Sequence, residues 1–160
     1  MTKTDFERFS AAFSYDPETG IIVRHGRWAG ASTTARTAHG YIQICFEGRK
    51  YYAHRVAWLL HTGAWPENEV DHINRAKDDN RWENLRSATR SENMANRPAQ
   101  TNNKVGLKGV SLHAKSGRWR AQIRKDGKVR GLGYFDAPED AHAAYVAAAN
   151  DNFGAFARTG

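Results

Sequence analysis

The stretch that decides the fold runs from Val70 to Asn93 and reads VDHINRAKDDNRWENLRSATRSEN. Its beginning predicts a short strand over 69–73, and a polar run dense in Asn and Asp then follows from 74 to 84. Residues 85–88 predict a second short strand. Thr89 and Glu92 have the spacing of a capping box, which predicts a helix that carries Asn93. The stretch therefore predicts two strands, joined by a long polar loop and followed by a helix.

The polar groups of this stretch suit metal-assisted chemistry. Asp71 and His72 would point to opposite faces of a flat strand, but at a bent strand end they can converge on one ion and one water. Asn84 lies where the loop must fold back, so its amide can bond to backbone groups on both sides. Asn93 could aim a carbonyl oxygen at the same place. Such oxygen ligands, completed by phosphate oxygens and waters, describe a Mg²⁺ or Mn²⁺ site. Taken singly, each of these residues is more often structural.

The residues upstream predict a small antiparallel sheet and a helix. Tyr15–Gly20 has the composition of a turn and leads into the apolar run Ile21–Val23. Glu47–Lys50 predicts a hairpin turn between residues 41–46 and 51–52, and residues 29–40 predict a loop. A helix is expected to begin near His54 and to end at 63–66. This region, up to residue 52, shows no evident chemistry of its own.

The residues downstream predict a second module. Arg97–Lys104 has the composition of a linker. Residues 109–135 alternate in strand fashion with glycine-bearing turns, and 138–150 predict an alanine-rich helix. The expected fold class is α+β: a small N-terminal antiparallel sheet, a strand–strand–helix core, and a three-stranded antiparallel sheet packed on one helix. The expected domains are 1–97, with its core at about 50–97, and 105–160, joined by a linker at 98–104.

The positive charge of the chain concentrates in its second half. Residues 86–130 hold twelve Lys and Arg against two acidic residues, a net +10, whereas the whole chain has +7. Such a charge favours polyanionic partners. Strand periodicity over 118–124 predicts an apolar face and a polar face. The polar face consists of Arg118, Arg120, Gln122 and Arg124. Because a sheet can enter the major groove, where Arg reads guanine and Gln reads adenine, this face predicts DNA binding.

Several separated blocks resemble phage-type HNH homing endonucleases, which belong to the ββα-metal (His-Me finger) nucleases. The blocks, in matching order and spacing, are Ala53–Trp58, Val70–Asn74, Asp79–Arg86 and Ser91–Asn93. The resemblance implies that His72 is the general base that activates a water, since a neutral imidazole suits this role. It also implies that Asp71 and Asn93 hold one metal ion and that Asn84 braces the loop. The metal would stabilise charge on the phosphate and on the leaving 3′ oxygen.

Two further residues are candidates in the same core. Arg90 lies one helical turn before Asn93 and could contact the scissile phosphate, although a solvated helix residue is an equal alternative. His54 recurs in the resemblance and is expected to support the site through hydrogen bonds.

Residues from about 105 to 154 resemble the plant ethylene-response-factor (Apetala) DNA-binding domain. The matching positions are Lys108–Val110, Trp119, Ala121, Ile123, Arg124, Gly131–Asp136, Glu139–Ala141, Ala144 and Tyr145. By position, the resemblance implies groove contacts at Lys108, Ser111, His113, Gln122 and Arg124, and the basic face adds Arg118 and Arg120. Gly131 stands where the family commonly has a large aromatic residue, so the plant recognition sequence is not transferred.

These features converge on one expected function, with one main alternative. Cys45 is the only cysteine, which excludes an internal disulfide or a Cys-rich zinc site, and no segment predicts a signal peptide or a membrane span. We expect a divalent-metal-dependent endonuclease that acts on double-stranded DNA as a monomer, encoded by a phage and cytoplasmic in the bacterial host. The alternative is a non-catalytic DNA-binding or regulatory protein that retains the HNH scaffold. An RNA-binding module ranks last, because the commonest RNA-binding sheets carry an exposed aromatic motif that is missing here.

Overall fold

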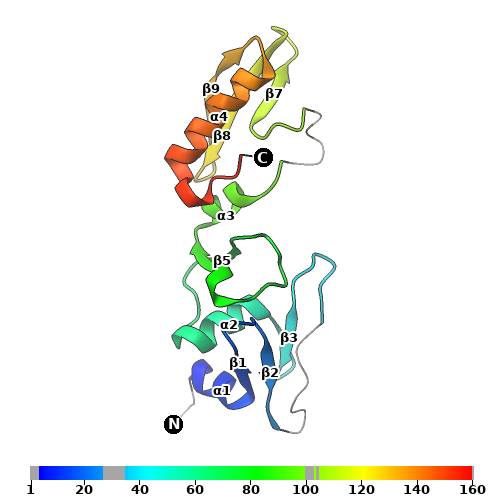
Figure 1. The fold of residues 1–160 in the computed structure, drawn as a ribbon, viewed down its shortest axis with the longest axis vertical. Helices are drawn as coiled ribbons and strands as arrows, with labels where there is room; N and C mark the ends of the chain where they lie inside the picture. Colours follow the sequence, from blue (N-terminus) through cyan, green and yellow to red (C-terminus); the bar gives the residue numbers. More distant parts are fainter. Residues whose placement is uncertain (1–3, 27–34, 100–102, 104, 160) are drawn as a thin grey trace. The chain divides into compact units, whose positions relative to one another are not determined.

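The computed structural model describes residues 4–26, 35–99, 103 and 105–159 (Figure 1). The chain divides into two compact units, Met1–Ser87 and Ala88–Gly160. Within the described ranges, no helix has both the length and the apolar character that a membrane span requires. Parts of the expected loop at 29–40 and of the expected linker at 98–104 lie outside the described residues.

The first unit begins with a helix and two β-hairpins. Helix α1 (Asp5–Ala12) starts at a capping box in which Thr4 and Glu7 bond to each other's backbone. Strands β1 (Phe13–Tyr15) and β2 (Ile22–Arg24) pair antiparallel, as do β3 (Gln43–Phe46) and β4 (Arg49–Tyr52). Helix α2 (Ala53–Thr62) then ends at Gly63, whose φ of +83° is the left-handed conformation that favours glycine. The expected hairpin at 41–52 and a strand at 22–24 are present, but they belong to two separate two-stranded sheets, and neither α1 nor β1 was predicted.

An aromatic and aliphatic core holds these elements together. Phe9 of α1 is 1% exposed, and its ring lies 4.7 Å from that of Phe46 and 5.3 Å from that of Trp65. Val56 and Leu59 of α2 are buried in the same cluster. Val70 and Leu85 also belong to it, so the two strands that flank the polar loop are anchored in this core.

The strand–loop–strand–helix order expected from the central stretch is confirmed. Strands β5 (Glu69–His72) and β6 (Leu85–Ala88) form a two-stranded sheet, and the short 3₁₀ helix η2 (Trp82–Asn84) immediately precedes β6. Helix α3 (Arg90–Asn96) starts at the expected capping box, in which Thr89 N donates to the Glu92 carboxylate at 2.8 Å.

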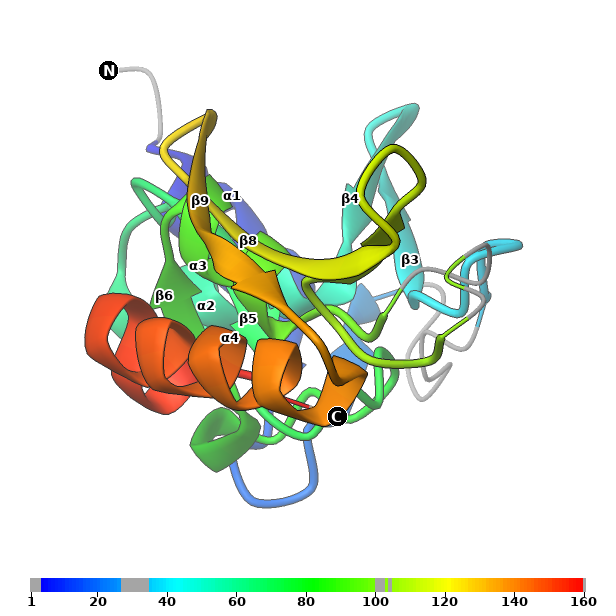
Figure 2. The same ribbon diagram turned by 90° about the horizontal axis from the view of Figure 1, so that it is seen from above.

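The second unit is a three-stranded antiparallel sheet covered by a helix. The sheet has the order β7 (Val110–His113), β8 (Arg118–Lys125), β9 (Lys128–Phe135), and α4 (Pro138–Phe153) runs along one face of it (Figure 2). A 3₁₀ turn, η3 (Gly154–Phe156), follows α4. The register passes from Ala121↔Gly133 to Gln122↔Gly131, so β9 carries a bulge at this point. The predicted sheet-and-helix module, and with it the α+β class, is confirmed.

The core of this unit lies between β8 and α4. Ala121 and Ala141 are both 0% exposed, and Ile123 packs with Tyr145 in an adjoining cluster. Gly109 approaches the helix closely, because a Cβ built on it would lie 2.0 Å from Cδ2 of Tyr145. Small residues at the interface therefore let the sheet and the helix meet.

Helix α3 is attached to the second unit by its own contacts. Ala95 is buried in the cluster of Ile123 and Tyr145. The Lys108 ammonium donates to the carbonyl oxygens of Ala95 and of Arg97, the latter at 2.7 Å, at the C-terminal end of the helix. The backbone N–H of Asp126 donates to Ser91 Oγ at 3.0 Å. The compact units accordingly divide before α3, whereas the expected domains placed this helix in the first one.

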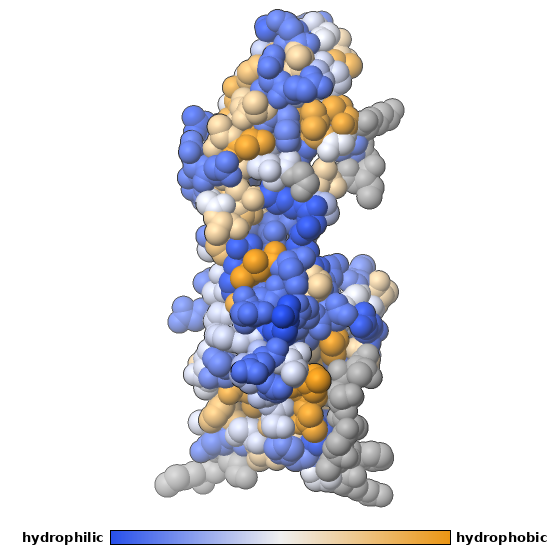
Figure 3. All heavy atoms as spheres, in the orientation of Figure 1, coloured by the Kyte–Doolittle hydropathy of each residue, from blue (hydrophilic) through white to orange (hydrophobic). Residues whose placement is uncertain are grey.

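The surface of both units is largely polar on the face drawn in Figure 3. Hydrophilic side chains predominate there, and apolar residues of the described part form small separate patches. Isolated apolar residues of this kind are normal on a protein surface and indicate no particular partner.

Candidate functional site

Asp71 and His72, at the end of β5, are both buried. They are 5% and 4% exposed, although adjacent residues of a strand point to opposite faces. Arg86 of β6 holds the Asp71 carboxylate: its Nε donates to Oδ2 at 2.9 Å, and its Nη2 lies 2.8 Å from the same oxygen. The carboxylate is therefore fixed in place by a charge-assisted pair across the two-stranded sheet.

His72 lies in a pocket of rings with one buried amide. Its Nε2 is 3.2 Å from Oδ1 of Asn80, which is 2% exposed. The ring of His54 packs edge-on against it, with centroids 5.0 Å apart, and the ring of Tyr41 lies at 6.0 Å. Burial lowers the pKa of His72 below its ordinary value, against the opposing effects of the Asn80 bond and the Asp71 charge. His72 is thus a neutral imidazole near pH 7.

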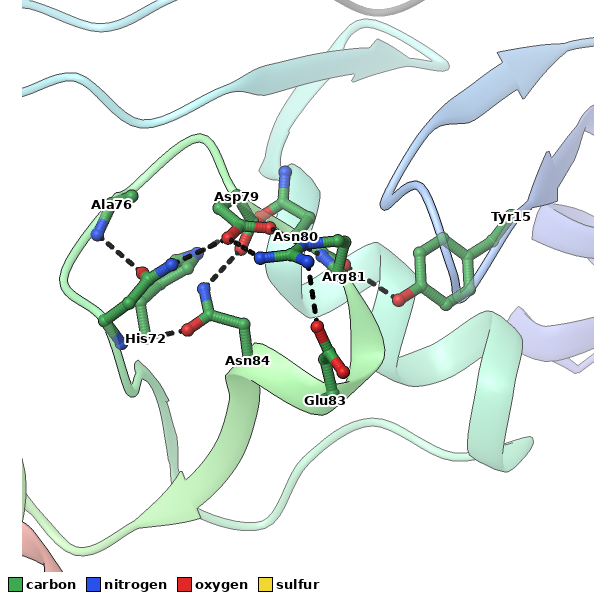
Figure 4. A network of polar contacts seen from close by, with 9 residues as sticks. Tyr15, His72, Ala76, Asp79, Asn80, Arg81, Glu83 and Asn84 are labelled. Carbon is green, nitrogen blue, oxygen red and sulfur yellow. Dashed lines mark hydrogen bonds and ion pairs between the residues drawn. The ribbon is translucent and has the colours of Figure 1, made fainter.

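Asn84 ties the two ends of the polar loop together (Figure 4). Its Oδ1 accepts from Asn74 N at 2.9 Å, and its Nδ2 donates to the Asp79 carbonyl at 2.7 Å. The backbone N–H of Ile73 donates to the Asn84 carbonyl at 2.9 Å. The hydrogen bonds on both sides that the sequence led us to expect of Asn84 are therefore present.

A clamp around Asp79 stiffens the middle of the same loop. Asp79 accepts from Arg81 Nε at 2.9 Å and from Asn74 Nδ2 at 2.7 Å. The hydrogen bond from Arg81 is the main reason why the pKa of Asp79 lies far below its usual range. Asp79 is consequently charged at all ordinary pH values, so its hydrogen bonds to Arg81 and Asn74 persist over that range.

The β1–β2 hairpin supports the loop from the other side. Tyr15 Oη donates to the Asn80 carbonyl at 2.8 Å, and Trp82 N donates to the Pro17 carbonyl at 2.8 Å. Gly20, with a φ of +75°, lies so close that a Cβ on it would be 2.5 Å from Arg81 N. Sequence reasoning assigned no role to this hairpin or to Asn80. The one available signal was that Asn80 falls within a block of the HNH resemblance.

His54, in the first turn of α2, contacts His72 through its ring. Its Nδ1 is buried and has no hydrogen-bond partner within the described part of the chain. Burial, assisted by the nearby His72 and Arg55, lowers the pKa of His54 to about 3. The ring also stacks on Tyr52, with centroids 5.4 Å apart and an interplanar angle of 12°. His54 therefore packs on the His72 ring as a neutral imidazole, and the hydrogen-bonded support expected of it stays a prediction.

Arg90 and Asn93 both lie on α3, which belongs to the second unit. Arg90 is exposed, and Asn93 N donates to the Thr89 carbonyl at 3.0 Å within the helix. The structure thus brings Asp71, His72, Asn84 and His54 together in the first unit, while the parts expected of Arg90 and Asn93 stay predictions.

The basic face of the second unit follows the expected strand parity. The register sets Ser111 opposite Arg120 and His113 opposite Arg118, and cross-strand partners of this kind share a face. Ala121 and Ile123 are buried on the α4 side. The apolar and polar faces expected of β8 are therefore present.

The residues expected to bind DNA differ in their surroundings. Arg118 is paired with Asp136 at 2.9 Å, and the Lys108 ammonium is bound to α3, where burial lowers its pKa to about 8. Arg120 Nε is buried and lacks a hydrogen-bond partner among the described residues. Gln122 and Arg124 border a hollow of about 670 Å³. That hollow is also lined by Arg90.

One comparison with known protein families covers the central stretch. Residues 51–95 match the family model described as HNH endonuclease. A solved structure, titled "DNA binding and cleavage by the HNH homing endonuclease I-HmuI", is similar over 89% of this chain and 82% of that chain, with a TM-score of 0.46 and 19% identity. None of the curated proteins matches. The family match includes Asp71, His72, Asn84 and α3 up to Ala95, whereas the β1–β2 hairpin and the C-terminal sheet lie outside it.

Proposed function

We propose that the chain is a divalent-metal-dependent DNA endonuclease that hydrolyses phosphodiester bonds. The observation that carries the proposal is the buried, neutral His72 beside an anchored carboxylate, within the segment that matches HNH endonucleases. An imidazole that is neutral near pH 7 can take a proton from a water. In this proposal His72 is the general base, and Asn84 keeps its loop in shape.

The donor atoms fit a hard cation such as Mg²⁺ or Mn²⁺. Asp71 offers a carboxylate that Arg86 holds in place. Within the described residues, no group of three or more His, Cys, Asp or Glu is arranged to enclose a metal. Mg²⁺ needs no such cage, because it commonly takes one or two protein oxygens and completes its shell with waters and phosphates. Asp71 and Asn93 would be its protein ligands, and the bound ion would stabilise negative charge on the phosphate and on the leaving oxygen.

The second unit would hold the DNA. Its β8 strand presents arginines and Gln122 on the face away from α4. Residues 86–130 also contain twelve basic residues and only two acidic ones, so this part of the sequence carries a strong positive charge. The contacts proposed are those of the ethylene-response-factor resemblance together with the basic face: Lys108, Ser111, His113, Arg118, Arg120, Gln122 and Arg124. Arg90 would add a phosphate contact. The substrate proposed is double-stranded DNA, bound by a monomer.

A cleavage assay with a binding control tests this function against the alternative of a non-catalytic DNA-binding protein. Supercoiled plasmid is incubated with the full chain in Mg²⁺ or Mn²⁺, in parallel with His72→Ala, and DNA affinity is measured in Ca²⁺. We expect cleavage by the wild type only, with equal affinity for both proteins. Equal binding without cleavage by either protein in any divalent metal would leave the non-catalytic alternative.

A further inference from the structure

Asn80 links the β1–β2 hairpin to His72 (Figure 4). We propose that Asn80 is a positioning residue that fixes the ring orientation and the tautomer of His72, and that the hairpin holds Asn80 in place. The proposal rests on the proposed function in one respect, namely that His72 is the base. It adds a residue and a segment to the nuclease machinery, and the hairpin lies outside the stretch that matches the HNH model.

The contact between the two side chains selects one tautomer. The Asn80 Oδ1 atom lies 3.2 Å from His72 Nε2. A carboxamide oxygen only accepts hydrogen bonds, so Nε2 must carry the proton. In a neutral imidazole the lone pair then lies on Nδ1. Nδ1 is thereby assigned as the nitrogen that takes the proton from water.

The burial of the pair makes the selection effective. Asn80 is 2% exposed and His72 4% exposed, so water cannot readily replace the amide as a partner of Nε2. A buried N–H that loses its acceptor is disfavoured. The contact with Asn80 therefore favours one tautomer of the buried ring, whereas a solvated imidazole populates both.

The hairpin fixes the backbone at Asn80 and just after it. Tyr15 Oη donates to the Asn80 carbonyl at 2.8 Å, and Trp82 N donates to the carbonyl of Pro17 in the β1–β2 turn. Burial raises the pKa of Tyr15, so the phenol remains protonated as a donor. Gly20 contacts the Asn80–Arg81 peptide so closely that no side chain fits between them. The hairpin thus sets the distance from which the Asn80 amide reaches His72.

The ¹⁵N NMR shifts of the imidazole nitrogens test the proposal in the full-length protein. The His72 signals are assigned by their loss in His72→Gln. We expect the Nε2–H tautomer in the wild type and in Asn80→Asp, which keeps an acceptor oxygen. In Asn80→Ala we expect a mixture of tautomers and, at saturating DNA and Mg²⁺, a kcat at least about tenfold lower with KM little changed. Glu18→Ala, an exposed change in the same turn, should leave the tautomer, kcat and KM unchanged.

A milder variant covers the case in which Asn80→Ala does not fold. Tyr15→Phe removes only the hydroxyl that binds the Asn80 carbonyl, and we expect it to shift part of the His72 population to the other tautomer. An Nδ1–H tautomer in the wild type would overturn the proposal, as would unchanged shifts in both Asn80→Ala and Tyr15→Phe. Because the NMR readout needs no cleavage, the expected tautomers in an inactive protein would support the positioning of His72 while contradicting the nuclease function.

Discussion

Replacing Gly20 by alanine should destabilise the first unit much more than the same change at Gly48. Both glycines have a φ of +75°, so both variants incur the cost of a left-handed alanine, about 1–2 kcal/mol. They differ in what the new methyl group meets. At Gly20 the Cβ would lie 2.5 Å from Arg81 N and 2.6 Å from the Asn80 carbonyl carbon, whereas at Gly48 no atom of the described residues lies within 4 Å.

The difference between the two variants measures how tightly the hairpin packs on the loop. Backbone atoms cannot rotate away from the methyl group, so Gly20→Ala adds an overpacking cost of about 1–3 kcal/mol. We therefore expect a total loss of about 2–5 kcal/mol at Gly20 and about 1–2 kcal/mol at Gly48. In thermal unfolding, each kcal/mol lowers the Tm of a domain of this size by about 4–8 °C.

Thermal and denaturant unfolding of the two variants, compared with the wild type, give the result. Gly20→Ala should also lower the cleavage rate, because the displaced loop carries Asn80. If both variants lose the same stability, the hairpin does not press against the loop. The hairpin would then not be what positions Asn80.

Three further predictions concern the loop clamp and the second unit. Asp79→Asn should destabilise the protein at pH 7. Because the pKa of Asp79 is lowered in the folded state, its charge stabilises the fold above about pH 4, and this stabilisation is lost as the pH falls further. Denaturant titrations that show the same loss of unfolding free energy at pH 7 and at pH 3 would contradict this prediction. Gly109→Ala should lower the free energy of unfolding by about 1–3 kcal/mol more than Gly117→Ala, because only a methyl group at Gly109 would collide with the Tyr145 ring. Similar unfolding midpoints for the two variants would refute this contact. Arg124→Ala should weaken target binding by about 1–3 kcal/mol, and unchanged affinity across several salt concentrations would remove Arg124 from the interface.

The parts of the fold that local sequence encodes were predictable. The capping box of α3, the Glu47–Gly48 turn and the glycine that ends α2 are short-range signals, and each stands where the pattern placed it. The side-chain hydrogen bonds of Asn84 also join residues at most ten positions apart, so this brace could be predicted from the sequence. Helix α1 was missed although Thr4 and Glu7 form a capping box. Phe6, Phe9 and Phe13 also have helical spacing, so this helix carried two local signals in the sequence and both were overlooked.

The supporting contacts of the site could not be read from local pattern. Tyr15 and Asn80 are 65 positions apart, and nothing near either residue indicates the bond between them. Strand parity likewise predicted the basic face, but it could not show that Arg118 pairs with Asp136 or that Lys108 caps α3. These partners arise from tertiary packing, which periodicity does not encode.

Chemical rescue of a His72 variant tests the central claim most directly. His72→Gly removes the imidazole from a buried pocket and leaves room for a small ring. We predict that this variant binds DNA as the wild type does, that it does not cleave DNA in Mg²⁺, and that added imidazole restores cleavage in proportion to its neutral form. Cleavage by His72→Gly at the wild-type rate without imidazole would show that His72 is not the base and would contradict the account.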